Sequence, residues 1–146
     1  MKTITGLDMN RIFDETEVAV RARAEQIMQE MREERADPQL AESRKAARAV
    51  ANEQEAQTIV DGLPALIAAR IPNGEQSIIL MTVPAAPGFT YSPGHAHVVD
   101  TAVSEHNAAV AALVIDMLTG VDKLHVRRVD YQSGRSIGGF FVVVNW

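Results

Sequence analysis

The sequence predicts an α+β fold in which an N-terminal helical hairpin precedes a small β-α-β-β sheet with strand order 1-3-2. Charge and aromatic content point to this division. Residues 1–70 hold 10 basic and 13 acidic side chains, and residues 71–146 hold only 4 and 6. Phe13 is the one aromatic residue of the first half, while six others lie in the second. We therefore expect a helical hairpin or arm over residues 1–71, for packing or oligomerisation, and a small α/β module over residues 72–146.

Two helices are expected in the first half. The segment 8–35 is rich in helix-forming residues, and its apolar side chains recur at a spacing typical of a narrow helical stripe. Asp37 followed by Pro38 then provides an N-cap and a first helical residue. The second helix should end near Asp61, because Gly62 and Pro64 interrupt the pattern. A further turn or short helix is expected over 63–71. The apolar stripe of the pair is thin, so it should pack on the second half or on another copy.

Three strands and one helix are expected in the second half. Residues 77–83 form a nearly all-apolar run that is typical of a buried strand. A third helix should cover 98–118 and end at Gly120, while 123–132 and 140–146 should form a hairpin of two strands. The apolar last strand favours the centre of the sheet and the charged strand favours an edge. The remaining face of the sheet would be covered by the N-terminal helices or by another copy.

The composition excludes several classes of protein. The net charge of −5 argues against a nucleic-acid binder held by bulk positive charge. Without cysteine there is no disulfide, no thiol nucleophile and no cysteine-ligated metal. No apolar stretch has the character of a secretory signal or a membrane span. We therefore expect a soluble, cytoplasmic protein that does not engage a membrane.

The segment 84–97 between the first strand and the third helix is the least ordinary one. It holds three prolines, two aromatic residues and two histidines, and no charge. A loop of this length in a compact domain is often functional. Phe89 and Tyr91 are candidate ligand-binding residues, although for either one alone the sequence favours a role in plugging the edge of the core. His95 and His97 are candidates as well. Two histidines are too few to hold a metal ion, so we expect no metal and no cofactor.

The late arginines form a second candidate group. Arg127, Arg128 and Arg135 fall on the charged strand and the turn after it, with Tyr131 close by. Alternation places Arg127 on the face of His125, Val129 and Tyr131, and Arg128 on the opposite face. A guanidinium group can bind a phosphate or carboxylate, or pair internally with Asp130 or Asp122.

Three functions are compatible with these patterns. The favoured one is a non-enzymatic homo-oligomeric binding or assembly protein that takes a small anionic ligand, such as a phosphorylated or nucleotide-like molecule, or a protein partner. The alternatives are a small enzyme that uses His95 or His97 as a general acid or base, and a nucleic-acid binder that uses Arg127, Arg128 and Arg135. The chain lacks the phosphate-loop, serine-hydrolase and zinc-protease motifs, so the sequence favours the first.

Overall fold

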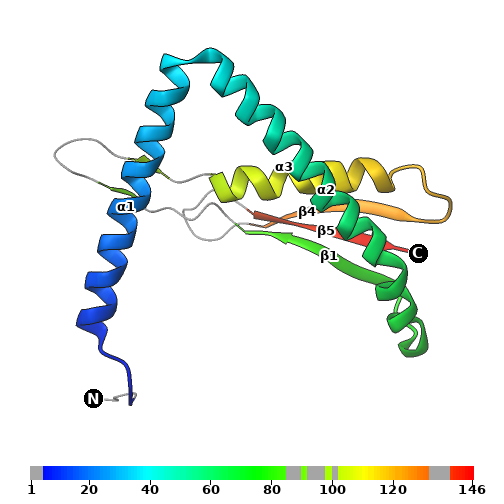
Figure 1. Ribbon diagram of the computed structural model, residues 1–146. Helices are drawn as coiled ribbons and strands as arrows, with labels where there is room; N and C mark the ends of the chain where they lie inside the picture. The colour runs from blue at the N-terminus through cyan, green and yellow to red at the C-terminus, as the bar shows by residue number, and fades with distance from the viewer. Residues whose placement is uncertain (1–4, 85–89, 92–97, 100–101, 132–138) are drawn as a thin grey trace. The chain divides into compact units, whose positions relative to one another are not determined.

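The computed structural model describes residues 5–84, 90–91, 98–99, 102–131 and 139–146, and Figure 1 shows their elements. Two long helices come first in the chain and a three-stranded antiparallel sheet follows, which confirms the predicted fold class. The elements are α1 (Met9–Ala36), α2 (Pro38–Arg70), a 3-10 turn (Ile71–Asn73), β1 (Ser77–Val83), β2 (Thr90–Tyr91), β3 (Val98–Val99), α3 (Ala102–Leu118), β4 (His125–Tyr131) and β5 (Gly139–Asn145).

Side-chain caps define the starts of the first two helices, and the one at Asp37 confirms the sequence prediction. The Asp8 carboxylate accepts a hydrogen bond from the Arg11 backbone N–H at 3.2 Å. The Asp37 carboxylate accepts from the N–H groups of Gln39 and Leu40 at 3.1 and 3.3 Å. Such bonds satisfy N–H groups that have no partner within the helix. Asp37 is therefore both the C-cap of α1 and the N-cap of α2.

The predicted end of the second helix near Asp61 is wrong, because α2 continues through Gly62 and Pro64 to Arg70. A proline inside a helix removes one backbone hydrogen bond and costs about 3 kcal/mol. Leu63 is only 4% exposed and Ile67 packs against the same core cluster. Burial of these two side chains offsets the cost of the proline, so packing carries the helix past a local stop signal.

The sheet has the order β1-β5-β4, and both neighbouring pairs are antiparallel. The outer strands β1 and β4 are consequently parallel to each other, and α3 connects them in the chain. The predicted strand 77–83 is confirmed at both ends. The predicted strands 123–132 and 140–146 differ from β4 and β5 by one or two residues at each end. The apolar strand lies in the centre and the charged strand at an edge, as predicted.

The helices α2 and α3 cover one face of this sheet (Figure 1). Alternate residues of β5 point to that face, and Phe140, Val142 and Val144 are buried there. The helical side of this core comprises Ala56 and Leu63 of α2 and Val110, Ala111, Val114 and Leu118 of α3. Gly120 has a φ of +88° two residues after α3, as expected for a residue that ends a helix.

The predicted start of the third helix at Val98 is wrong. Val98 and Val99 form β3, which pairs antiparallel with Thr90 and Tyr91 of β2. Paired β-branched and aromatic residues favour a strand over a helix. Consequently α3 begins at Ala102, and the predicted loop 84–97 contains a strand of its own.

The contacts divide the chain into two compact units. One comprises residues 1–41 and 88–100, and the other comprises residues 42–87 and 101–146. In the first unit, β2 and β3 lie against α1. In the second, most of α2 belongs with α3 and the sheet. This division differs from the predicted boundary at residue 71. Two predictions remain predictions: that residues 1–71 and 72–146 form separate domains, and that α1 packs along α2 as a hairpin.

Candidate functional site on the open face of the sheet

The face of the sheet opposite α2 and α3 forms the most distinctive surface of the second unit. Residues of β5 that alternate with the buried ones point to this side, and all three are only half-buried. The strand register aligns them with side chains of both outer strands. We call this surface the open face. It comprises Ser77, Ile79 and Thr82 of β1, Phe141, Val143 and Asn145 of β5, and His125, Arg127, Val129 and Tyr131 of β4.

The middle row of the open face changes from apolar to cationic across the sheet. Ile79 pairs with Val143, and Val143 pairs with Arg127. Directly opposite residues of this kind have Cβ atoms about 5 Å apart. The Ile79 residue is 56% exposed. Arg127 is also exposed, and it makes no ion pair within the part of the chain that the structure describes. This row therefore presents apolar surface beside an available guanidinium group.

One end of the open face is closed by Tyr131. Its ring stacks on Phe141 with the ring centroids 4.7 Å apart, and its hydroxyl donates to the Val83 backbone carbonyl at 3.4 Å. The ring crosses over Gly139, where an added Cβ atom would lie 2.5 Å from the Tyr131 Cζ atom. Tyr131 thus ties the three strands together. Because it lies four residues from Arg127, about 13 Å along the strand, the two side chains do not hold one small anion together.

The other end of the open face is polar. Asn145 of the central strand pairs with Ser77 on one side and with His125 on the other. The Asn145 Oδ1 atom is buried and has no hydrogen-bond partner among the described residues. No hydroxyl of the described open face is hydrogen-bonded to a histidine or a carboxylate.

Arg128 lies on the opposite face from Arg127, as the alternation predicts. Its guanidinium carbon is 3.8 Å from the centre of the Phe140 ring, and its Nε atom donates to the Asp130 carboxylate at 2.7 Å. Asp130 therefore fills the predicted role of internal partner, while Asp122 forms no such pair among the described contacts. Of the two described candidate arginines, Arg127 is the one left to bind a ligand.

Four of the remaining candidate residues are not placed by the structure. Phe89, His95, His97 and Arg135 lie outside the described residues. Tyr91 is described by its backbone, in β2 of the first unit. No group of three or more potential metal ligands occurs in the described ranges. Within those same ranges, no helix is long and apolar enough to cross a membrane.

A second surface of the same unit is a groove between α2 and α3. Small and apolar side chains line its floor, with one amide and two carboxylates: Ala49, Asn52, Glu53, Ala109, Ala112, Leu113 and Asp116. The Asn52 Oδ1 atom is buried without a hydrogen-bond partner in the described structure. Nearby, Glu55 and His106 join the two helices through a contact of 2.5 Å. Among the described lining residues, the ionisable groups are the carboxylates of Glu53 and Asp116.

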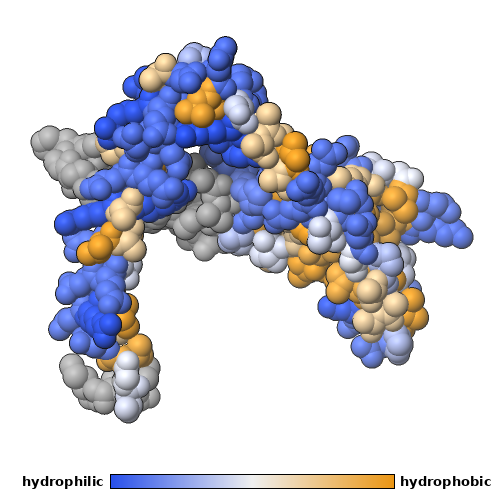
Figure 2. Space-filling model, viewed as in Figure 1, coloured by the Kyte–Doolittle hydropathy of each residue, from blue (hydrophilic) through white to orange (hydrophobic). Residues whose placement is uncertain are grey.

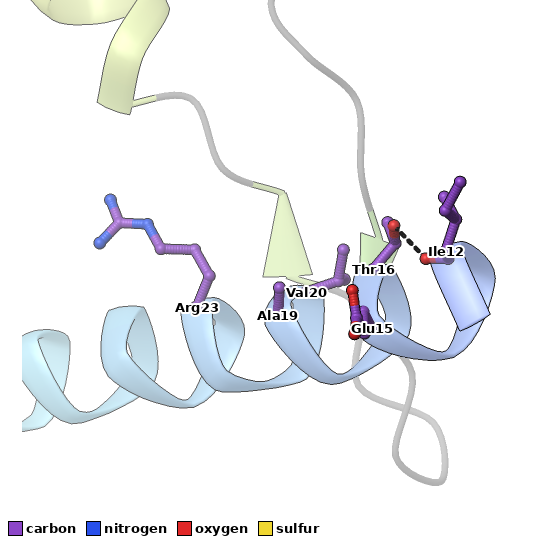
Figure 3. Close-up of a pocket in the computed structure, with 6 residues that line it drawn as sticks. All are labelled: Ile12, Glu15, Thr16, Ala19, Val20 and Arg23. Atoms are coloured by element: carbon purple, nitrogen blue, oxygen red, sulfur yellow. Dashed lines mark hydrogen bonds between the residues drawn. The ribbon is translucent and has the colours of Figure 1, made fainter. Parts of the chain in front are cut away.

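A third surface lies along α1 in the first unit, beside β2 and β3 (Figure 3). Its six lining residues come from one side of a single helix: Ile12, Glu15, Thr16, Ala19, Val20 and Arg23. Their polar groups are occupied locally. The Thr16 hydroxyl donates to the Ile12 carbonyl at 2.7 Å, and Glu15 pairs with Arg11 at 2.8 Å. This surface is therefore a shallow hollow in which the charged side chains are already engaged by neighbouring residues.

Reasoning from the sequence predicted Arg127, but it missed Ile79 and Val143. It expected the N-terminal helices or another copy to cover the face opposite the third helix, whereas α2 packs on the same face as α3. The strand 77–83 was interpreted as buried throughout because nearly all its residues are apolar. A bulge between Ile79 and Met81 shifts the register by one residue, so the strand lacks the strict alternation that would have revealed its exposed side. Comparison with family models, curated proteins and solved structures finds no match for this chain.

Proposed function

We propose that this protein is a non-enzymatic, self-associating binding protein whose open sheet face is the binding surface. The observation that carries this proposal is the row Ile79–Val143–Arg127, which places exposed apolar surface beside a guanidinium group that has no described partner. An apolar group next to a cationic one suits a ligand that carries both an apolar part and an anionic group. Figure 2 shows hydrophobic side chains gathered along β1 and the C-terminal half of α2, whereas hydrophilic ones dominate α1.

The chemistry of the row defines the ligand. Ile79 and Val143 would contact an apolar body, and Arg127 would bind a carboxylate, sulfonate or phosphate attached to it. A ligand with both parts fits this row better than a bare inorganic anion, which would leave the apolar surface exposed to water. We therefore propose an amphipathic anion as the ligand class.

The size of the face suits a small ligand better than a protein partner. Three strands of seven residues give a surface of about 14 Å by 24 Å, or roughly 340 Å², from ordinary strand spacing and rise. A stable protein partner typically covers about 800 Å² on each side, so one copy provides less than half of that area. Self-association would enlarge the binding surface and would also stabilise the small sheet, which offers little apolar surface of its own.

Binding of the fluorescent probe anilinonaphthalene sulfonate tests the proposed site, because the probe has an aromatic body and a sulfonate group. The wild-type chain should bind it, and Arg127→Ala should weaken binding about fivefold, which corresponds to roughly 1 kcal/mol for an exposed charge contact. Arg128→Ala is the matched control on the other face and should leave the affinity unchanged. Equal affinities for all three proteins would overturn the proposed site.

A further inference from the structure

We infer that two copies of this chain join edge to edge along β1, forming a continuous six-stranded sheet with a single open face. The inference rests on the proposed function, in which self-association enlarges the binding surface. Beyond that proposal, we identify β1 as the strand through which the copies meet, and we infer that the two β1 strands pair in antiparallel orientation. The argument depends on the difference between the two edges of the sheet.

The outer strands of the sheet differ in their protection against pairing. β4 carries Arg127, Arg128 and Asp130 along its edge, and such charges normally prevent another strand from adding to a sheet. β1 has the sequence SIILMTV, with no charge, no proline and no glycine. An exposed apolar edge of this kind is expected to be covered by another strand.

The backbone hydrogen bonds show which groups of β1 are available. The Trp146 N–H donates to the Gln76 carbonyl at 3.0 Å, so Gln76 directs its backbone groups toward β5. Backbone direction alternates along an antiparallel strand, and the bulge adds one residue to the count. The N–H groups of Ile79 and Thr82 therefore point away from β5, whereas that of Met81 points toward it. Ile79 and Thr82 provide donors and acceptors for an added strand.

Charge favours a second copy of β1 as the added strand. An antiparallel pair of β1 strands places no charged side chains opposite each other, since the strand is neutral from Ser77 to Val83. Two β4 strands centred on Arg128 would bring two guanidinium groups together, which is destabilising. A pair centred on Val129 would place Arg128 opposite Asp130, but each copy already pairs these two residues internally, so little would be gained. A symmetric contact uses the same strand on both copies, as most homodimers do. The joined sheet would then end at two charged β4 edges.

The bulge at Leu80 is the one feature of β1 that opposes pairing, because bulges bend an edge strand. Here it also lets two consecutive residues, Leu80 and Met81, pack against the core. The strand thereby keeps its inner side buried while Ile79 and Thr82 remain on the outer row. The bulge limits the pairing to the stretches on either side of Leu80. If the bulge were enough to prevent pairing, the protein would be monomeric.

Amide hydrogen exchange of the wild-type chain, followed residue by residue by NMR, tests this contact. In the proposed dimer the amides of Ile79 and Thr82 are hydrogen-bonded, so they should exchange about tenfold more slowly than in a dilute monomer. The Met81 amide should be protected at both concentrations, because it faces β5. The Arg128 amide, which points outward from the opposite edge, should exchange fast at both. Fast exchange at Ile79 and Thr82 in a sample of twice the monomer mass would overturn the β1 contact alone.

Variants at the two edges separate this inference from the proposed function. Thr82→Pro removes an N–H that the fold does not use and should halve the mass in solution, whereas the matched Arg128→Pro should leave the mass unchanged. Circular dichroism establishes folding, and Thr82→Lys serves the same purpose if the proline variant unfolds. An unchanged mass in both Thr82 variants overturns the β1 contact. A wild-type chain that is monomeric at every concentration contradicts self-association itself.

Discussion

Replacement of Gly139 by alanine should destabilise the sheet strongly, although it adds only one methyl group. The new Cβ atom would lie 2.4 Å from the Val83 carbonyl oxygen and 2.5 Å from both the Cζ atom and the hydroxyl oxygen of Tyr131. The Tyr131 ring could rotate away. The Val83 oxygen belongs to the backbone of β1, so the strands would have to separate by about 1 Å to restore ordinary contact.

The magnitude follows from three losses. Forcing an extra carbon into a closely packed site typically costs 1 to 3 kcal/mol. Displacement of Tyr131 from its stacked position on Phe141 costs about 0.5 to 1.5 kcal/mol more, and its hydrogen bond to the Val83 carbonyl is lost as well. With about 0.5 to 1.5 kcal/mol for the hydrogen bond, these losses predict that Gly139→Ala lowers the free energy of unfolding by about 2 to 6 kcal/mol.

Urea denaturation followed by circular dichroism measures this effect at a fixed protein concentration. Gly62→Ala is the matched control, because Gly62 lies inside α2 and a Cβ atom there meets nothing within 4 Å. It should stabilise the protein by up to about 1 kcal/mol through higher helix propensity. The two glycine-to-alanine changes therefore have opposite signs. Equal effects at both positions would refute the packing that we describe around Tyr131.

Three further predictions concern the core, the continuity of α2 and the edge strand β4. Leu63→Ala should lower the free energy of unfolding by about 2 to 5 kcal/mol, measured by urea denaturation. Leu66→Ala, at a position 42% exposed, should change it by less than about 1 kcal/mol. Similar losses for the two variants would mean that α2 does not pack as described. Pro64→Ala should raise the thermal midpoint, since it restores a helical N–H to bond the Val60 carbonyl, and a lower midpoint would contradict a continuous α2. Arg128→Ala should lower the free energy of unfolding by no more than about 1 kcal/mol, because the ion pair of Arg128 with Asp130 is exposed to solvent. A larger loss would show that the contacts of Arg128 stabilise the fold more than an exposed ion pair normally does.

Much of the fold could be predicted because local patterns and packing agree there. The apolar run 77–83 and the capping pair Asp37–Pro38 both gave element boundaries that the structure confirms. Prediction failed where tertiary contacts override a local signal. Gly62 and Pro64 indicate a helix end, yet burial of Leu63 continues the helix. The sequence alone does not show which stop signals the core will override.

The candidate site was only partly predictable for the same reason. Alternation along β4 correctly separated Arg127 from Arg128, because that strand is regular. It could not reveal that Tyr131 crosses Gly139 to reach β1, since this contact joins residues far apart in the chain. Nor could it place Ile79 in the same row as Arg127, because that alignment depends on the register of two strand pairs and on a bulge.

The mass of the wild-type chain in solution tests the central claim most directly. Sedimentation velocity over a range of concentrations reports this mass without labels or substitutions. Self-association predicts a species of at least twice the 15.9 kDa of one chain, with a fraction that rises with concentration. A single species of 15.9 kDa at every concentration would contradict the account.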